Sequence, residues 1–311
     1  MEEIIQKFYT ELYTSTETHP NPNIPATAEV LPEVLEAEVR SAIATTKPGT
    51  APGTDGIPIE LLKAGGPELH KVLAKMFTAI LRSHDMSNDW RVARTVLLFK
   101  KGDREDIGNY RPISLLPVLY KLYTKIILQR IEKCLDDYQP VEQAGFRKKF
   151  AVTDHMQAVS QLIERAREYH IPLVLVFVDY KKAFDSVEHG AVIQALLDAG
   201  IDPGYIEAIK DCYTEAKTTI RMFERDLEIP VRRGVRQGDT ISPKLFTTAL
   251  QYAMKGLEWE SYGIPVDGRN LNNLRFADYI VLIAKTPAEA ERMINDMNQA
   301  SRKIGLEMNM R

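Results

Sequence analysis

The sequence predicts an α+β fold in which an antiparallel sheet is backed by helices. Residues 173–178 are a continuous apolar run of the kind that forms a buried strand. Residues 274–277 and 280–284 are two apolar runs separated by only two residues, as in a β-hairpin. Apolar residues at helical spacing precede and follow these segments. The resulting order of strand, helices, hairpin and helix indicates an antiparallel sheet with helices packed on it.

The composition fits a large globular chain. With 311 residues, of which 44% are hydrophobic, the chain is long enough to bury a sizeable core as one large domain or two subdomains. The 40 Lys and Arg nearly balance the 43 Asp and Glu, so a formal charge of −3 gives no global sign of a polyanionic partner. Nucleic-acid binding would therefore require local clusters of basic residues.

The cysteine content and the length of the apolar runs indicate where in the cell the protein is expected. Cys134 and Cys212 are the two cysteines, and their wide separation argues against a disulfide framework and against structural zinc. No apolar run approaches the length of a membrane span, and the acidic N-terminus is unlike a signal peptide. We expect a soluble intracellular protein without a membrane partner, in the cytoplasm or the nucleus.

The first half of the chain is mixed, with helices predominating. A helix is predicted over residues 2–13, followed by a linker rich in Thr, Pro and Asn over residues 14–32. The elements predicted next are helices at 34–43, 59–63 and 68–82, a strand at 95–99 and a helix at 115–133. A loop rich in Pro and Gly separates the first two of these helices.

The character of the sequence changes near residue 171. The apolar run that follows stops at Asp179, as a buried strand does when it carries a polar group at its end. The hairpin is predicted to hold Asp278 and Tyr279 in its turn. Thr286 starts a further helix as an N-cap in a capping box, and Gly305 is suited to the position after its end.

Two carboxylates are candidates for metal binding. In an antiparallel sheet the end of the strand before Asp179 and the hairpin turn can meet, which would bring Asp179 beside Asp278. Adjacent carboxylates repel each other unless a cation lies between them, and hard oxygen ligands select Mg²⁺, which bridges phosphates in nucleotidyl transfer. The alternative is a pair of ordinary turn aspartates, and spacing alone favours that alternative.

Several motifs resemble those of reverse transcriptases. VFVDYKKAFDSV (176–187), RRGVRQGDTISPKLF (232–246) and LRFADYIVLIA (274–284) are similar to three successive motifs of that family. Upstream, APGTDGIPIELLK, NYRPISLLPVLYKLYTKIILQRI and EQAGFRK resemble the fingers of enzymes from non-long-terminal-repeat, LINE-like retrotransposons. The resemblance covers most of the chain from about residue 33.

The resemblance implies the fingers and palm of a right-hand polymerase, with a ferredoxin-like palm sheet carrying helices on one face. The implied division is an N-terminal helix and linker at 1–32, fingers at 33–170 and palm at 171–311, with part of the fingers interleaved near 190–235. The sequence after Gly305 ends where a thumb would follow, so we expect the thumb to be absent. We also expect the chain to be a fragment of a longer open reading frame, since an endonuclease usually precedes this region.

The catalytic metal ligands follow from the same resemblance. It implies that Asp179 is the first metal-binding carboxylate, that Tyr180 contributes its backbone carbonyl and that Asp278 is the second carboxylate. Together they would hold two Mg²⁺ ions, with Mn²⁺ as an alternative, for the transfer of a deoxynucleotide to a primer 3′-hydroxyl. The implied partners are an RNA template, a DNA primer and dNTPs, while the oligomeric state stays open.

The nucleotide pocket is implied by three further positions. Phe184 matches an aromatic ring under the incoming sugar that leaves no room for a 2′-hydroxyl, which favours dNTPs. Gln237 would line the pocket, and Gly238 would allow close backbone approach. Outside the motifs, Phe184 would be an ordinary core residue, and the segment around Gln237 merely a helix N-terminus.

Basic and helical positions complete the implied site. Lys100, for which Lys101 is an alternative, and Arg111 match positions at the triphosphate. The implied template and primer contacts come from basic clusters around Arg147 and Arg236, and from a helix, started by Ser242 and Pro243, whose exposed face tracks the template. Each basic residue alone would be an ordinary solvated surface charge.

One position departs from the family pattern. The hairpin should read Phe-Ala-Asp-Asp, whereas the fourth position here is Tyr279, a phenol that is neutral at pH 7. We expect this loss of an anionic ligand to lower the rate by several orders of magnitude. Asp185 is not expected to substitute, because it follows the sugar-contacting Phe184 and should point elsewhere.

Three functions are compatible with these motifs. The first is an RNA-directed DNA polymerase domain, impaired by Tyr279. The second is a catalytically inactive nucleic-acid-binding remnant of the same ancestry. The third, an RNA-dependent RNA polymerase, should carry a polar residue where Phe184 stands and is therefore disfavoured.

Overall fold

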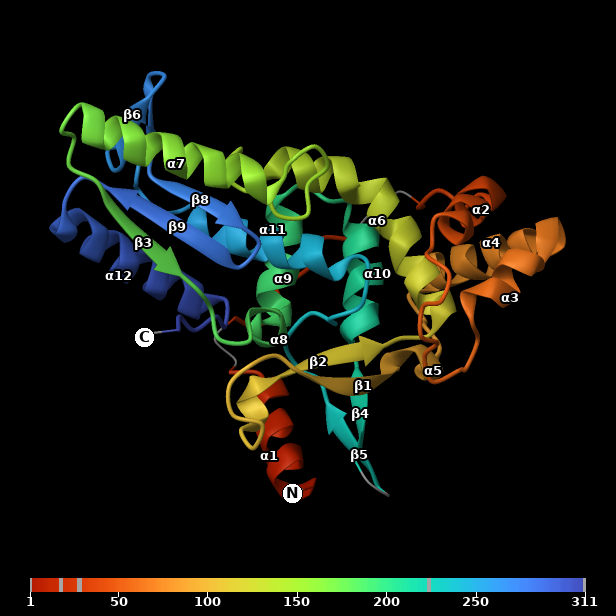
Figure 1. Ribbon diagram of the computed structural model, residues 1–311. Helices are drawn as coiled ribbons and strands as arrows, with labels where there is room; N and C mark the ends of the chain where they lie inside the picture. The colour runs from red at the N-terminus through yellow and green to blue at the C-terminus, as the bar shows by residue number, and fades with distance from the viewer. Residues whose placement is uncertain (1, 17–18, 27–29, 223–224, 310–311) are drawn as a thin grey trace.

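A computed structural model describes residues 2–16, 19–26, 30–222 and 225–309, and these form two main sheets surrounded by helices (Figure 1). The first sheet has three strands in the order β3–β9–β8, and the second has four in the order β2–β1–β4–β5. A two-stranded hairpin of β6 (Ile264–Val266) and β7 (Arg269–Leu271) projects beside the first sheet.

The three-stranded sheet is fully antiparallel. Its strands are β3 (Val174–Val178), β9 (Tyr279–Ala284) and β8 (Asn273–Phe276). One face packs on α12 (Pro287–Lys303), through residues that include Ile280, Leu282 and Met293. The predicted cap of this helix is confirmed: the Thr286 hydroxyl accepts a hydrogen bond from the Glu289 amide, and Gly305 follows the helix end with a φ of +84°.

The opposite face of this sheet is only partly covered. Helix α7 (Val152–Glu168) places Leu162 against Leu274 and Ile283, so a second helix layer accompanies the predicted one. Towards the β8–β9 turn this cover ends, where the Phe177 and Tyr279 side chains are 73% and 52% exposed. Such large exposed apolar side chains are typical of binding surfaces.

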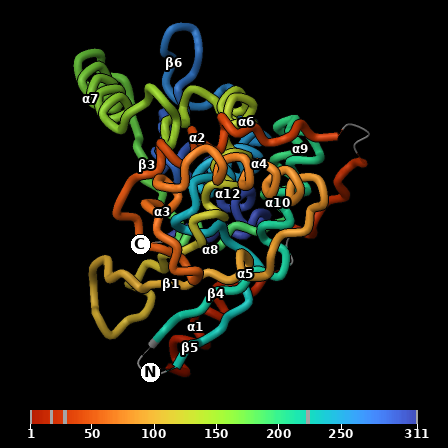
Figure 2. Tube along the Cα trace, turned by 90° about the vertical axis from the view of Figure 1, so that its right-hand side faces the viewer, coloured from red at the N-terminus to blue at the C-terminus, as the bar shows by residue number. Residues whose placement is uncertain are grey.

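The four-stranded sheet joins segments far apart in the sequence. Its strands are β1 (Val92–Phe99), β2 (Tyr110–Leu115), β4 (Lys217–Met222) and β5 (Arg225–Pro230). Strand β1 pairs antiparallel with β2 and parallel with β4. The strands β4 and β5 fall in the part of the chain for which the sequence predicts interleaving. Helix α1 (Glu2–Tyr13) packs on β5, and the two lie together at the lower end of the molecule (Figure 2).

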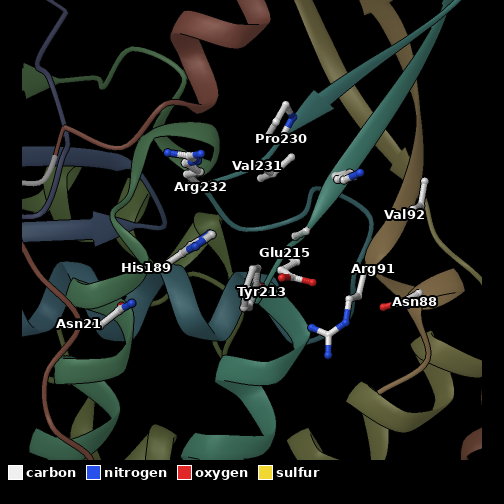
Figure 3. A pocket seen from close by; sticks show the side chains of 12 residues that line it. Asn21, Asn88, Arg91, Val92, His189, Tyr213, Glu215, Pro230, Val231 and Arg232 are labelled. Atoms are coloured by element: carbon white, nitrogen blue, oxygen red, sulfur yellow. The ribbon is translucent and has the colours of Figure 1, made fainter. Parts of the chain in front are cut away.

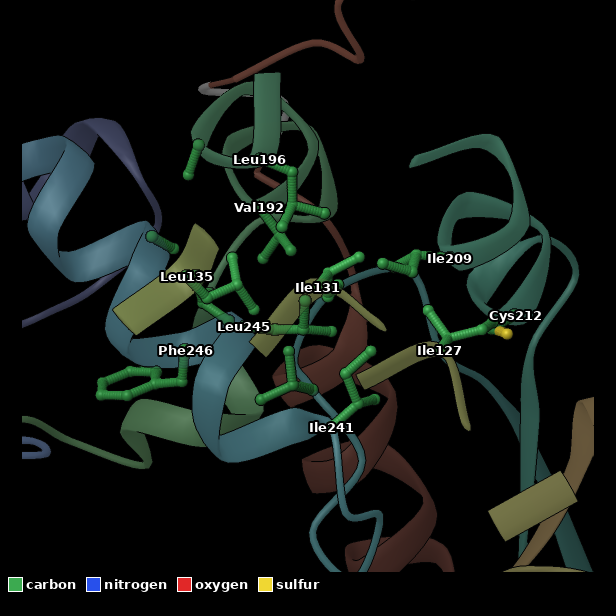
Figure 4. Packing of buried hydrophobic residues seen from close by; sticks show 14 of the residues in the cluster. Ile127, Ile131, Leu135, Val192, Leu196, Ile209, Cys212, Ile241, Leu245 and Phe246 are labelled. Atoms are coloured by element: carbon green, nitrogen blue, oxygen red, sulfur yellow. The ribbon is translucent and has the colours of Figure 1, made fainter. Parts of the chain in front are cut away.

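The remaining helices share one core with the palm sheet. They are α2 (Glu36–Ala44), α3 (Ile59–Ala64), α4 (Gly66–Ser83), α5 (Asn88–Arg91), α6 (Val118–Tyr138), α8 (Ala183–Ser186), α9 (His189–Asp198), α10 (Pro203–Tyr213) and α11 (Ser242–Met254), with a 3₁₀ turn at Ile107–Asn109. Ile131 of α6, Leu196 of α9 and Leu245 of α11 meet at the centre of the molecule (Figure 4). Because one cluster of buried side chains extends from Leu31 to Met308, the two halves of the chain are packed together.

One helix begins later in the structure than predicted from the sequence. The helix expected from residue 115 begins at Val118, because Leu115 pairs with Arg94 as the last residue of β2. Among the described residues, no helix is long and apolar enough to cross a membrane.

Candidate active site

The hairpin that carries Asp278 turns one residue earlier than predicted. Strand β8 ends at Phe276 and pairs with Tyr279 as the first residue of β9, so Ala277 and Asp278 form the turn. Ala277 has a φ of +58°, a left-handed conformation that residues with a side chain rarely adopt. Tyr279 is therefore the first residue of a strand and not part of the turn, and its ring is half exposed.

Asp179 and Asp278 are brought to the same end of the sheet. Val178 at the end of β3 pairs with Ile280, which puts the following Asp179 next to the turn (Figure 1). Burial raises the pKa of the Asp278 carboxyl, and the negative charge of Asp179 raises it further. The two predicted carboxylates are thus close enough to repel each other.

The backbone at Tyr180 is fixed from one side. The Asn309 amide donates to the Asp179 carbonyl at 2.8 Å, and the Lys181 amide donates to the Glu307 carbonyl at 2.9 Å. Because carbonyls alternate in direction along an extended chain, the Tyr180 carbonyl points away from this C-terminal segment. The Tyr180 hydroxyl is buried, and it lies 2.6 Å from the Ser301 hydroxyl.

These oxygen atoms fit a divalent cation only in part. Two carboxylates and a carbonyl are the hard ligands that Mg²⁺ prefers. Across residues 2–16, 19–26, 30–222 and 225–309, however, no group of three or more His, Cys, Asp or Glu side chains is arranged to hold a metal. At the third position, burial and the charges of Asp278 and Asp179 raise the pKa of the Tyr279 phenol, which keeps it neutral near pH 7. The site offers two carboxylates.

Phe184 has a fixed position beside this site. Its ring stacks on Phe246 of α11, with centroids 4.5 Å apart, and meets Phe146 edge to face at 6.2 Å. Phe246 is fully buried, whereas Phe184 is half buried. The ring of Phe184 therefore rests on a rigid core residue while part of it stays accessible.

Gln237 and Gly238 connect the palm with the fingers. The Gln237 side-chain amide donates to the Asp185 carboxylate at 2.8 Å, and the Gln237 carbonyl accepts from the Ser114 amide at 2.7 Å. A side chain at Gly238 would place its Cβ 2.6 Å from the Ser114 carbonyl, so glycine is required there. The close approach seen at Gly238 is made with strand β2, whereas the prediction concerned the nucleotide pocket.

Asp185 is bonded within the protein. Its carboxyl is buried and accepts a hydrogen bond from Gln237, and its charge adds to the effect of burial in raising the pKa of Tyr9 and Tyr13 in α1. Burial raises the pKa of the Asp185 carboxyl to about 7, although Gln237, Lys182 and Arg111 favour the anion.

This raised pKa predicts a pH-dependent stability. Between the ordinary pKa of an aspartate and about pH 7 the folded state binds more protons than the unfolded state, so stability falls as pH rises. Asp185→Asn removes this penalty and is expected to stabilise the protein by about 2–3 kcal/mol more at pH 8 than at pH 5. Urea unfolding at both pH values measures it, with exposed Asp89→Asn as the control. An equal effect at both pH values would contradict the assignment.

Basic residues just after β1, within β2 and in the segment after β3 lie near the turn that carries Asp278. The positive charges of Lys100 and Arg111 act on Asp278, where they lower its pKa against the effect of burial. Lys182, which the sequence analysis did not single out, donates from its ammonium group to the Tyr110 carbonyl, and burial lowers its pKa. Its place in the motif at 176–187 was the signal available for finding it.

Two arginines expected at nucleic-acid phosphates make hydrogen bonds within the protein. Arg236 is buried, donates to the carbonyls of Trp90 and Arg91, and lies over the Tyr120 ring at 5.0 Å. Arg147 donates to the Pro140 carbonyl at 2.7 Å and more weakly to two others. Arg236 therefore has no access to a template, because its guanidinium is needed to satisfy buried carbonyls.

The helix started by Ser242 and Pro243 also differs from its predicted role. Helix α11 begins at Ser242 with Pro243 in its first turn, as predicted. Every residue of α11, all of which the structure describes, is buried or half buried. The expected exposed face is absent because α6, α9 and α12 pack around this helix.

A large cleft lies apart from these residues. Its volume is about 820 Å³, and it opens between β4, β5, α9 and α10, with Tyr213, His189 and Arg232 in its wall (Figure 3). Burial lowers the pKa of His189 to about 4, so this imidazole is neutral at pH 7. The predicted catalytic residues line none of this cleft's described wall.

Comparison with known proteins identifies the family. Residues 99–311 match the family described as reverse transcriptase (RNA-dependent DNA polymerase). A Popillia japonica protein, the retrovirus-related Pol polyprotein from type-1 retrotransposable element R2, is 30% identical over 80% of this chain and 34% of its own length. The transposon TX1 uncharacterized 149 kDa protein of Xenopus laevis is 26% identical over 92% of this chain and 23% of its own length. The chain thus spans a minor part of these relatives.

The fold is similar to that of a solved structure as well. Apo telomerase from Candida tropicalis, truncated from the C-terminal domain, aligns with a TM-score of 0.50 over 77% of this chain and 54% of that chain. At 13% identity this likeness concerns the fold alone, and it agrees with a fingers and palm architecture. On the family match and these relatives, the chain belongs to the reverse transcriptases, RNA-directed DNA polymerases, of non-long-terminal-repeat retrotransposons.

Proposed function

We propose that this chain is an RNA-directed DNA polymerase domain whose catalytic centre keeps Asp179 and Asp278 but is disabled by Tyr279. The observation that carries the proposal is the mutual electrostatic effect of these three side chains at one end of the sheet. Asp278 is half buried next to another carboxylate, so the two negative charges repel each other and a bound cation would stabilise the pair.

In the proposed reaction, different residues of the site bind the metal ions and the triphosphate. Asp179, the Tyr180 carbonyl and Asp278 would hold divalent cations, whose positive charge would activate the primer 3′-hydroxyl and neutralise the triphosphate. Lys100 and Arg111, whose positive charges act on Asp278, would bind triphosphate oxygens. Substrate is thereby oriented between the fingers sheet and the palm turn.

The sugar and base meet a second set of residues. Phe184, supported by Phe246, supplies the flat surface beneath the sugar. Gln237 would line the same pocket, and its amide nitrogen is bonded to Asp185, the residue after Phe184. The Phe184 contact selects a deoxynucleotide by shape, since a ring held against a buried neighbour cannot move aside for a 2′-hydroxyl.

Tyr279 weakens this centre. It supplies no negative charge at pH 7, so metal binding depends on two carboxylates. Its ring also stands on the exposed end of the sheet, where Phe177 is exposed too. The remaining site binds metal weakly and transfers nucleotides slowly.

A second candidate function is nucleic-acid binding without catalysis. The exposed rings of Phe177 and Tyr279 favour it, because aromatic side chains stack on bases without regard to sequence. The nearby positive charges of Lys100 and Arg111 suit a phosphate backbone.

Primer extension on an RNA template, with Mg²⁺ and dNTPs, tests the proposal. The chain as it stands and the Tyr279→Asp protein are compared, with Asp179→Ala in each as the blank. Extension by the Tyr279→Asp protein alone supports a disabled polymerase. Extension by the unaltered chain well above its blank contradicts the effect assigned to Tyr279, and no extension by either protein leaves the binding function as the better account.

A further inference from the structure

The turn that carries Asp278 is held in a strained conformation. Ala277 is buried and has a φ of +58°, which costs free energy for any residue other than glycine. Such a conformation persists only where the surrounding structure imposes it. The cause must therefore be sought in the contacts of the Ala277 backbone.

Those contacts come from the side chain of Gln143. Its carbonyl oxygen accepts hydrogen bonds from the Ala277 amide at 3.0 Å and from the Gly145 amide at 2.9 Å. Its amide nitrogen donates to the Ala277 carbonyl over 3.5 Å. Two N–H donors on one oxygen fix the orientation of the Gln143 amide, and this side chain is fully buried.

The backbone around Gln143 is anchored on the same hairpin. The Arg275 amide donates to the Glu142 carbonyl at 2.8 Å, and the Ala144 amide donates to the Arg275 carbonyl at 2.9 Å. A Cβ at Gly145 would lie 2.3 Å from the Ala277 nitrogen, so only glycine permits this approach. Residues 142–145 therefore run along the end of β8 like an additional short strand.

We propose that Gln143 is a positioning residue that holds the Ala277–Asp278 turn in the geometry needed for Asp278 to bind metal. The inference rests on the proposed function, because it concerns the same catalytic carboxylate. Gln143 acts through the Ala277 backbone and has no role in contacting substrate. Its amide bonds offset the cost of the positive φ and so determine where the Asp278 carboxylate lies.

A double-mutant cycle between positions 143 and 277 tests this role. Gln143→Met keeps the volume and removes the hydrogen bonds, while Ala277→Gly removes the reason for needing them, since glycine adopts a positive φ without strain. All variants are made in the Tyr279→Asp protein. Gln143→Met is expected to lower the maximal rate of primer extension by about 10- to 100-fold, with a smaller change in the KM for dNTP. In the Ala277→Gly protein the same change should lower the rate less than about threefold.

Two outcomes would overturn the proposal. One is an unchanged rate with Gln143→Met, and the other is an equal loss with and without Ala277→Gly, which would indicate general packing. If Gln143→Met does not fold, Gln143→Asn replaces it, because its amide is one methylene too short to reach the turn. The same two outcomes, observed with Gln143→Asn, would then overturn the proposal.

Manganese binding separates this proposal from the proposed function. In the same proteins, the affinity for Mn²⁺ measured by electron paramagnetic resonance should fall at least about fivefold with Gln143→Met and recover with Ala277→Gly. If the Tyr279→Asp protein fails to extend primers but shows this pattern, the polymerase proposal fails and the positioning role stands. If Mn²⁺ affinity is insensitive to Gln143, the positioning role fails whatever the activity.

Discussion

Replacing Tyr279 by aspartate is expected to raise the rate of Mg²⁺-dependent primer extension by on the order of a thousandfold. The new carboxylate would stand at the first position of β9, paired with Phe276 and next to Asp278. Its side chain would replace a ring that is half exposed, so the substitution leaves the core of the hairpin intact. A third anionic ligand would then complete the cation site, which is the physical reason for the gain.

Matched substitutions distinguish charge from bulk at this position. Tyr279→Asn has nearly the shape of the aspartate variant without its charge, and Tyr279→Phe keeps the ring without the hydroxyl. Both are expected to stay within about tenfold of the unaltered chain, because neither adds an anion. A gain with Tyr279→Asn equal to that with Tyr279→Asp would contradict the metal-ligand explanation and favour steric hindrance by the tyrosine.

Replacing Phe184 by valine in the Tyr279→Asp protein is expected to reduce the preference for dNTPs over NTPs by about a hundredfold. The ring of Phe184 is stacked on buried Phe246, so it cannot shift to admit a 2′-hydroxyl. Valine opens space at the sugar without adding a polar group. The measurement is the ratio of kcat/KM for a dNTP and the matching NTP on one template.

The control for this prediction is Phe184→Tyr, which retains the ring and its stacking on Phe246. It should keep the preference for dNTPs within about threefold of the parent protein. Undiminished discrimination with Phe184→Val would mean that another residue excludes the ribose 2′-hydroxyl. Gln237, whose amide is bonded to Asp185, would then be the next residue to test.

The strand and helix ends that are determined by neighbouring residues were predicted from the sequence. The apolar run before Asp179 forms β3 as predicted, but the prediction that this strand is buried was wrong, because only Val178 is buried and Phe177 is exposed. Thr286 caps α12 through its hydroxyl, and Gly305 follows the helix end because glycine adopts a positive φ without strain. The meeting of Asp179 and Asp278 followed from strand order alone.

Long-range contacts account for what the sequence did not predict. The turn begins at Ala277 because Gln143, distant in sequence, stabilises its left-handed conformation, whereas turn propensity would assign that role to Gly or Asn. Arg236 is buried because carbonyls of Trp90 and Arg91 need donors there. A charged residue in a basic run is ordinarily exposed. The burial of Arg236 and the turn at Ala277 therefore could not be predicted from neighbouring residues in the sequence.

In the proposed function, Asp179, Asp278 and position 279 form one cation site from which the third carboxylate is missing. Titration of Mn²⁺ into the unaltered chain and the Tyr279→Asp protein, followed by electron paramagnetic resonance, measures this site. We predict at least about tenfold tighter binding by the Tyr279→Asp protein, abolished by Asp179→Ala. Equal affinity in both proteins, or tight binding that survives Asp179→Ala, would contradict the account.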